Sequence, residues 1–159
     1  MKQKTFMMLK PDAFAGNHAQ EVLEELRAHG LVIEKSCTLT VTMEVMKTLI
    51  DYAGVIDSMS KDFNFPGKLF NSFYYDGPHT IQPMEVSYEG DEDIITLTRT
   101  LAGKTNPQDA GADTIRGKYS DDSYDKASAA VRLVNNVIHA SDSHESAQRE
   151  LSIWNSYLK

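Results

Sequence analysis

The hydrophobic positions of the chain follow two periodicities that alternate from one end to the other. Alternating or β-branched apolar residues predict strands over residues 4–10, 31–41, 79–88 and 131–138. Apolar residues spaced three and four apart predict helices over residues 18–29, 43–52, 94–102 and 143–154. The remaining long segments predict a loop and short helix over 54–75, and a Gly-, Asp-, Ser- and Thr-rich stretch without helical period over 103–130.

Proline and small polar residues mark several boundaries of these elements. Pro11 ends the first predicted strand, because proline lacks a backbone donor and its predecessor favours an extended conformation, so Lys10 lies at a strand end. Pro83 weakens the centre of the third predicted strand. Ser141 and Asp142 are available to cap the N-terminus of the last helix.

The order of the elements predicts one domain over residues 1–159. A chain of 159 residues is long enough to bury a single sizeable core. Its strands are too few and too mixed with helices for a doubly wound parallel sheet. We therefore predict the α+β class, as a ferredoxin-like α/β sandwich with a four-stranded antiparallel sheet covered by helices. An extended loop at about 117–130 is expected to be functional or mobile.

The composition is that of a folded globular protein, with 41% hydrophobic and 25% charged residues. No apolar run reaches the ~18 residues that a membrane-spanning helix needs. The segment that follows Met1 is strand-like and lacks the apolar core of a signal peptide. The single cysteine, Cys37, fits a reducing compartment. We expect a cytoplasmic protein without a membrane partner.

The formal charge of −7 argues against nucleic acid as a partner, because binding to the phosphate backbone needs a basic surface. An anionic small molecule would instead need individual cations placed against this overall charge. The basic residues beside Gly, Thr, Pro or Asn are the candidates for such a site: Lys10, Arg99, Lys104, Arg116 and Lys118.

The triplet Gly103-Lys104-Thr105 matches the end of a phosphate-binding P-loop. That motif needs a glycine five positions before Gly103, where this chain has Thr98, and no predicted strand directly precedes it. We therefore exclude a P-loop. A capped helix end explains Gly103 and Lys104, since a cation is favourable near the negative end of a helix dipole. It leaves Thr105 unexplained.

His139 lies at the end of the last predicted strand, just before the last predicted helix. Taken alone, a histidine there is more often structural than catalytic, and Arg116 is more often a solvated residue than a phosphate ligand. The start of the following helix would, however, present free N–H groups to an anion near the imidazole. Glu150 lies further along that helix and is placed to orient the ring. No pair of the five histidines has metal-ligand spacing.

Three separated motifs resemble those of the nucleoside diphosphate kinase family and occur in the same order. They are TFMMLKPDA (5–13), GKTNPQDAGADTIRG (103–117) and NVIHASDSHESAQRE (136–150). The resemblance covers most of residues 5–154 and implies a ferredoxin-like fold. It also implies a ping-pong reaction that depends on Mg²⁺, in which the imidazole carries the γ-phosphoryl group from a nucleoside triphosphate to a nucleoside diphosphate. The Mg²⁺ would arrive on the nucleotide, without protein ligands of its own.

The resemblance also implies roles for individual residues. The phosphorylated residue would be His139, with Ser141 and Glu150 supporting it and Glu150 orienting its ring. The nucleotide would be bound by Lys10, which neutralises the transferring phosphoryl group, by Arg99, Thr105 and Arg116 at the distal phosphates, and by Asn136 at the sugar hydroxyl. A neutral imidazole, with an ordinary pKa of about 6.5, keeps a lone pair for this chemistry at pH 7.

Several positions depart from the family pattern, among them Ala13 in place of a glycine and Gly16-Asn17 in place of an Arg-Gly pair, and two departures concern aromatic residues of the site. Ile50 aligns with the active-site tyrosine, and Tyr52 lies two residues further on. Asn64 aligns with the phenylalanine that stacks on the base, which leaves the stacking residue open between Phe63 and Phe65. These departures keep open the alternative of a catalytically weak nucleotide-binding or regulatory member of the same fold.

The chain also differs from the commoner family form in length. It is longer between Arg116 and Asn136, and we predict that residues 119–130 form a mobile flap near the nucleotide. It ends soon after Trp154. The resemblance implies a homo-oligomer, and the short C-terminus leaves hexamer, tetramer and dimer open.

Overall fold

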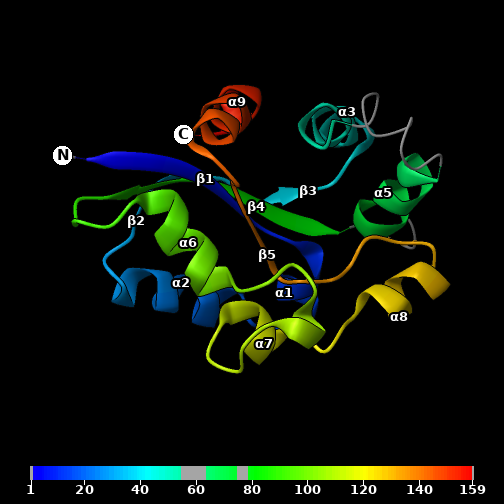
Figure 1. Cartoon of the computed structure of the whole chain (residues 1–159). Helices are drawn as coiled ribbons and strands as arrows, with labels where there is room; N and C mark the ends of the chain where they lie inside the picture. The colour runs from blue at the N-terminus through cyan, green and yellow to red at the C-terminus, as the bar shows by residue number, and fades with distance from the viewer. Residues whose placement is uncertain (1, 55–63, 75–78, 159) are drawn as a thin grey trace.

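The structure, a computed structural model, describes residues 2–54, 64–74 and 79–158, which form a sheet with helices on both faces (Figure 1). The strands are β1 (Gln3–Leu9), β2 (Val32–Ser36), β3 (Leu39–Thr40), β4 (Thr80–Tyr88) and β5 (Ile138–Ala140). The helices are α1 (Pro11–Ala15), α2 (Ala19–Ala28), α3 (Met43–Tyr52), α5 (Phe65–Phe73), α6 (Ile94–Ala102), the 3₁₀ helix η1 (Pro107–Asp109), α7 (Ile115–Tyr119), α8 (Tyr124–Ala129) and α9 (His144–Trp154).

The sheet is antiparallel throughout, with strand order β2-β4-β1-β5. The first strand, β1, is central and pairs with β4 from Gln3 opposite Tyr88 to Leu9 opposite Gln82. The predicted sandwich is therefore confirmed. The single strand predicted over 31–41 is divided into β2 and β3, and β3 pairs with a separate stretch of β4.

Pro83 lies inside the nine-residue strand β4, where its missing N–H would be expected to interrupt pairing. Its carbonyl accepts a hydrogen bond from the Cys37 N–H at 3.3 Å, in the gap between β2 and β3. The N–H and C=O of one strand residue point to the same neighbour, so the absent donor also faces this gap. Pro83 therefore separates β2 from β3 without disturbing the pairing of β4 with β1.

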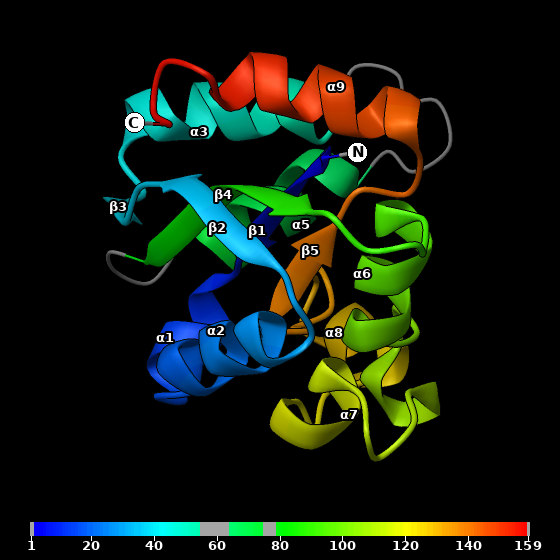
Figure 2. The same ribbon diagram turned by 90° about the vertical axis from the view of Figure 1, so that its left-hand side faces the viewer.

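Two hydrophobic cores lie on opposite faces of the sheet because successive side chains of β1 point in opposite directions. Phe6 and Met8 belong to the core beneath α3, α5 and α9, while Met7 and Leu9 belong to the core beneath α2 and α6. All four side chains are fully buried. Figure 2 shows α3 and α9 together on one face of the sheet, with α1 and α2 on the other.

The strand predicted over 131–138 is wrong for residues 131–137, because β5 contains only Ile138–Ala140. Val131 and Val137 have φ angles of 53° and 72°, which a strand does not permit. The backbone groups of Leu133 and Asn135 between them are bonded by side chains from other parts of the chain instead of by a neighbouring strand. A β-branched, apolar sequence therefore adopts an irregular conformation here for tertiary reasons.

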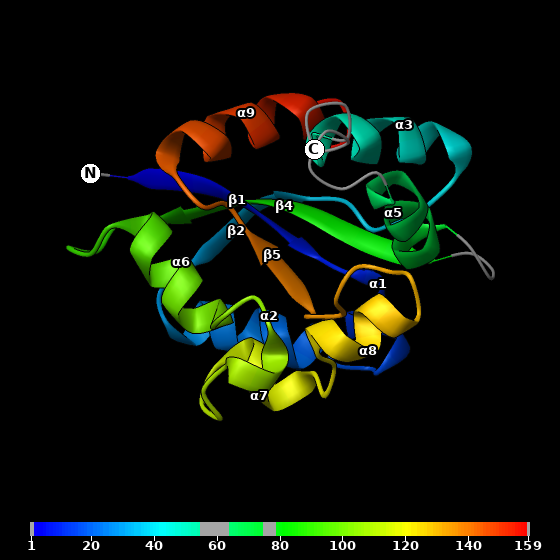
Figure 3. The same ribbon diagram turned by 45° about the vertical axis from the view of Figure 1, so that its right-hand side comes forward.

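The segment 103–130, predicted to lack helices, contains η1, α7 and α8. The polar residues that suggested a loop are the N-caps of these helices: Asn106, Thr114 and Ser123 each accept a hydrogen bond from a backbone N–H two or three residues ahead. In Figure 3, α8 lies beside the chain that leads into β5. The extended-loop prediction is thus wrong for the residues of α8, and the mobility of 119–130 stays a prediction.

Two boundary residues also differ from the predictions. Pro11 ends β1 as expected but begins α1 directly, at a position where its missing N–H has no helical partner to lose. The cap of α9 is Ser143, whose hydroxyl accepts from the Ser146 N–H at 3.0 Å, and not Ser141 or Asp142. Part of the loop predicted over 54–75 lies outside the described residues. Among those described, no helix is long and apolar enough to cross a membrane.

Candidate active site

His139 lies in the middle of β5, where pairing with Met8 of β1 fixes its backbone. Its Nε2 is 2.7 Å from Oε1 of Glu150, which comes from the second turn of α9 and has a side chain only 9% exposed. The same carboxylate oxygen accepts from the Ser141 hydroxyl at 2.7 Å. The structure therefore brings together the three residues that the sequence assigns to the catalytic group.

The carboxylate of Glu150 sets the tautomer of the imidazole. An ionised carboxylate only accepts hydrogen bonds, so Nε2 of His139 carries the proton and Nδ1 keeps its lone pair. Ser141 is fully buried, and its hydroxyl is also 3.2 Å from the carbonyl of Phe6 in β1. Strand and helix together hold the ring in one orientation.

Lys10, at the end of β1, donates from Nζ to the Val134 carbonyl at 2.8 Å and to Oδ1 of Asn136 at 2.9 Å. Asn136 in turn donates from Nδ2 to the Thr105 carbonyl at 3.0 Å. An ammonium group has three donors, so one N–H of Lys10 is left for another acceptor. Burial lowers the pKa of Lys10 from its ordinary value to about 8.

Arg116 lies in α7, and its two terminal nitrogens donate to the carbonyls of Gly103 at 2.9 Å and Ile138 at 2.8 Å. It thereby ties the end of α6 to the residue before His139. Its Nε is buried without a partner among the described residues. Burial, assisted by the nearby charge of Arg99, lowers the pKa of Arg116 to about 10. Each terminal nitrogen of a guanidinium carries two N–H groups, so one on each is left for an anion.

These groups surround one cavity of about 460 Å³. Of the residues to which the family resemblance assigns roles, only the fully buried Ser141 is absent from this lining. The candidate cations Lys104 and Lys118 do not line this cavity either. The basic residues on the lining outnumber the carboxylates, which makes the site locally cationic in a chain of charge −7. The predicted residues on the lining are Lys10, Arg99, Thr105, Arg116, Asn136, His139 and Glu150.

The cavity also has lining residues that the sequence analysis left open or missed. Tyr52, not Ile50, lines it, with its ring 5.2 Å from that of His139 and almost perpendicular to it. Phe65 lines it as well, whereas Phe63 lies outside the described residues. Arg149 was not predicted, although its position next to Glu150 could have signalled it. Its terminal nitrogen donates to the Asp51 carbonyl at 2.6 Å, which links α9 to the end of α3.

The sequence of the chain matches the family model described as nucleoside diphosphate kinase over residues 3–157. The chain belongs to the nucleoside diphosphate kinase family. Curated members include one from Methanosphaera stadtmanae, 36% identical over 97% of this chain and 86% of its own length. Another, from Streptococcus thermophilus strain CNRZ 1066, is 36% identical over 96% of this chain and 97% of its own length.

Solved structures of nucleoside diphosphate kinases have the same fold. The enzyme from Pyrobaculum aerophilum superposes with a TM-score of 0.74 at 27% identity, over 97% of this chain and 96% of that one. The Borrelia burgdorferi enzyme, solved as a transition-state mimic with vanadate and ADP, gives 0.83 at 24% identity, over 99% and 90% of the two chains. The chain is accordingly a phosphotransferase that moves a phosphoryl group between nucleoside triphosphates and diphosphates.

Proposed function

We propose that His139 carries the phosphoryl group between the two nucleotides in a ping-pong reaction. The observation that supports this most directly is the hydrogen bond from Nε2 to Glu150, which reserves the lone pair of Nδ1 for the substrate. In the first half-reaction, Nδ1 forms a bond to the γ-phosphorus of a nucleoside triphosphate. The bond from that phosphorus to the bridging oxygen breaks, and its electron pair leaves with the diphosphate. In the second half-reaction, a terminal oxygen of another nucleoside diphosphate forms a bond to this phosphorus. The bond from the phosphorus to Nδ1 then breaks, and its electron pair returns to Nδ1.

The basic residues on the cavity lining would position the phosphates and stabilise their charge, which is the main catalytic requirement of phosphoryl transfer. Lys10 would direct its remaining N–H to the transferring group. Arg99 and Thr105, together with the remaining terminal N–H groups of Arg116, would bind the distal phosphates. Asn136 keeps a second amide N–H for a sugar hydroxyl, since only one is used by the Thr105 carbonyl.

The divalent cation that nucleotide kinases of this family need is proposed to be Mg²⁺ bound by the nucleotide itself. Among the described residues, no group of three or more His, Cys, Asp or Glu side chains could hold a metal ion. Mg²⁺ usually keeps several waters and binds substrate phosphates with few protein carboxylates, so a lining with Asp142 and the already bonded Glu150 fits it. When bound, the cation would neutralise charge on the phosphates.

Labelling with γ-³²P-ATP and Mg²⁺ tests the role of His139. We expect acid-labile label on the wild-type protein, none on His139→Ala, and chase of the label into GTP when GDP is added. His144→Ala is the matched control, because His144 lies five residues away and is exposed, with its ring bonded to Asp93. Equal labelling of His139→Ala and wild type would assign the phosphoryl group to another residue.

The same experiment addresses the catalytically weak or regulatory alternative, which the family match does not favour. A protein of that class would bind ATP in equilibrium dialysis and yet leave wild-type His139 unlabelled. Tyr52 supports an active enzyme, because an aromatic side chain reaches the imidazole even though the aligned residue is Ile50.

We also propose that the chain works as a single domain, in a homo-oligomer and in the cytoplasm. The family membership supports assembly, and the lone Cys37 supports a reducing compartment. Light scattering coupled to size-exclusion chromatography will distinguish dimer, tetramer and hexamer. Cell fractionation will test the compartment, and recovery of the protein with membranes would contradict it.

A further inference from the structure

Residues 133–136, between α8 and β5, belong to no helix or strand, so their backbone groups need partners from elsewhere. The Leu133 N–H donates to the Ser72 hydroxyl of α5 at 2.8 Å. The Asn135 N–H donates to Oδ2 of Asp122 at 2.7 Å, and its carbonyl accepts from the Ser120 hydroxyl. The segment is therefore held by side chains, and two of these, Ser120 and Asp122, lie directly before α8.

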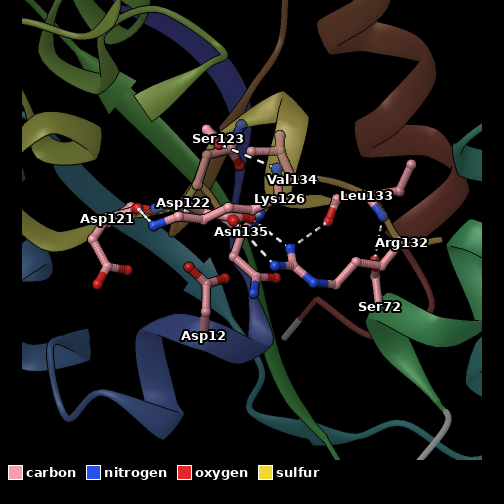
Figure 4. Close-up of polar contacts among 12 residues, drawn as sticks. Asp12, Ser72, Asp121, Asp122, Ser123, Lys126, Arg132, Leu133, Val134 and Asn135 are labelled. Carbon is pink, nitrogen blue, oxygen red and sulfur yellow. Dashed lines mark hydrogen bonds and ion pairs between the residues drawn. The ribbon is translucent and has the colours of Figure 1, made fainter. Parts of the chain in front are cut away.

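Asp122 is the centre of these contacts. Its two carboxylate oxygens receive the two terminal nitrogens of Arg132, at 2.5 Å and 3.0 Å, in a bidentate ion pair. Figure 4 shows the Arg132 guanidinium directed at Asp122, with a further hydrogen bond to the Leu133 carbonyl. The Asp122 side chain is only 6% exposed, so solvent screens the pair little. Although burial raises it, hydrogen bonds from Arg132 and from backbone N–H groups bring the pKa of Asp122 down to about 2.

The segment that this ion pair fixes carries both acceptors of Lys10, the Val134 carbonyl and Oδ1 of Asn136. Asp122 reaches the residue between them. We propose that the Asp122–Arg132 pair is a positioning clasp that holds the Lys10 ammonium group where the transferring phosphoryl group arrives. This inference rests on the proposed function and extends it to residues 119–132, which the roles assigned above do not include.

The clasp is expected to act on Lys10 and not on His139, because the residues after 136 have their own anchors. The Val137 N–H donates to Asp12 at 2.9 Å, and the Val137 carbonyl accepts from the Lys10 N–H at 2.8 Å. From Ile138 onward the chain is paired with β1. Loosening residues 133–136 would therefore leave the imidazole in place while the lysine loses its fixed partners.

The test compares Asp122→Asn with Asp121→Asn, which removes the same charge from an exposed side chain one residue earlier. Single-turnover labelling by γ-³²P-ATP gives the rate at saturating nucleotide and the apparent Kd. We expect Asp122→Asn to lower the saturating rate about tenfold, as loss of a charged hydrogen-bond network does, with a smaller change in Kd. Asp121→Asn should stay within about twofold of wild type.

The same substitution in a Lys10→Met background separates positioning from a general structural effect. If the clasp acts through Lys10, Asp122→Asn will change the rate of Lys10→Met by less than about twofold. An equal loss in both backgrounds, or no loss in the wild-type background, would overturn the inference. Absence of label on the wild-type protein would instead refute the proposed function, so the two failures are distinguishable.

A second pair of variants covers the case in which Asp122→Asn does not fold. Arg132→Lys keeps the charge but loses the bidentate geometry, and it should lower the saturating rate less than Arg132→Met. Lys126→Met is the control, because Lys126 is an exposed residue of α8 whose Nζ donates to the Asp121 carbonyl, outside the ion pair. Thermal unfolding of each variant shows whether it is folded. Equal rates for Arg132→Met and Lys126→Met would also overturn the inference.

Discussion

Replacement of Glu150 by glutamine removes the charge that orients and supports the imidazole while keeping the shape of the side chain. In the wild type, one carboxylate oxygen accepts from both His139 Nε2 and the Ser141 hydroxyl, each at 2.7 Å. Phosphorylation of Nδ1 draws electron density from the ring and makes the Nε2 proton more positive. A carboxylate stabilises that change more than a neutral amide does, so the variant should be impaired in the chemical step.

The size of the effect follows from the burial and the number of bonds. A hydrogen bond to a charged group contributes about 1.5–3 kcal/mol, and 1.4 kcal/mol corresponds to about a factor of ten in rate. Glu150 is 9% exposed, which leaves little solvent screening. We therefore expect Glu150→Gln to phosphorylate His139 about 10- to 100-fold more slowly than the wild type. Ser141→Ala removes a neutral donor and keeps the carboxylate, so its loss should be smaller, about 2- to 10-fold.

Quenched-flow labelling with γ-³²P-ATP measures this step directly, and titration with ATP separates the rate from the affinity. Glu145→Gln is the control, because Glu145 is an exposed acid in the first turn of the same helix. Its rate should match that of the wild type. If Glu150→Gln retained a rate within twofold of the wild type and remained folded, the negative charge of Glu150 would have no part in the step, and this reasoning would be wrong.

Two further predictions concern pH and packing. Because the pKa of Lys10 is lowered to about 8, its charge is lost above that pH, so kcat/KM for ATP should fall as pH rises through about 8, and this limb should be absent in Lys10→Met. Between pH of about 8 and the ordinary pKa of 10.5, Lys10 keeps its proton in the unfolded chain but not in the folded one. The contribution of Lys10 to the free energy of unfolding therefore rises with pH in this range, which urea unfolding measures. A Cβ on Gly117 would lie 2.0 Å from the Gly111 carbonyl oxygen, so Gly117→Ala should reduce stability by about 1–3 kcal/mol and displace Arg116. Gly67→Ala, with open space around its Cβ, should not lower the melting temperature, and equal melting temperatures for the two variants would contradict the packing argument.

The sequence predicts the sheet and its main helices because local periodicity and burial agree there. In β1, alternate residues enter two different cores, so a run of apolar residues from Phe6 to Leu9 has only one suitable place, at the centre of the sheet. The prediction fails for 131–137 because partners distant in sequence determine the backbone. Ser72 and Asp122 bond to this segment from outside it, and no periodicity within the segment encodes them.

The candidate site shows the same division between local and distant information. The motif residues around His139 and Arg116 could be identified from the sequence because the family resemblance contains them. The contact of Tyr52 with His139 could not be identified in this way, because the residue that aligns with the family tyrosine is Ile50. That contact depends on how α3 packs against α9. The clasp of Asp122 and Arg132 could not be predicted for a further reason. Both residues lie in the stretch where the chain is longer than the commoner family form, so the family motifs contain no residues that correspond to them. Hydrogen bonds that lead from Asp122 through residues 133–136 to Lys10 connect this stretch to the chemistry. An added segment in this family can therefore contribute to the active site by fixing a residue that the motifs already contain.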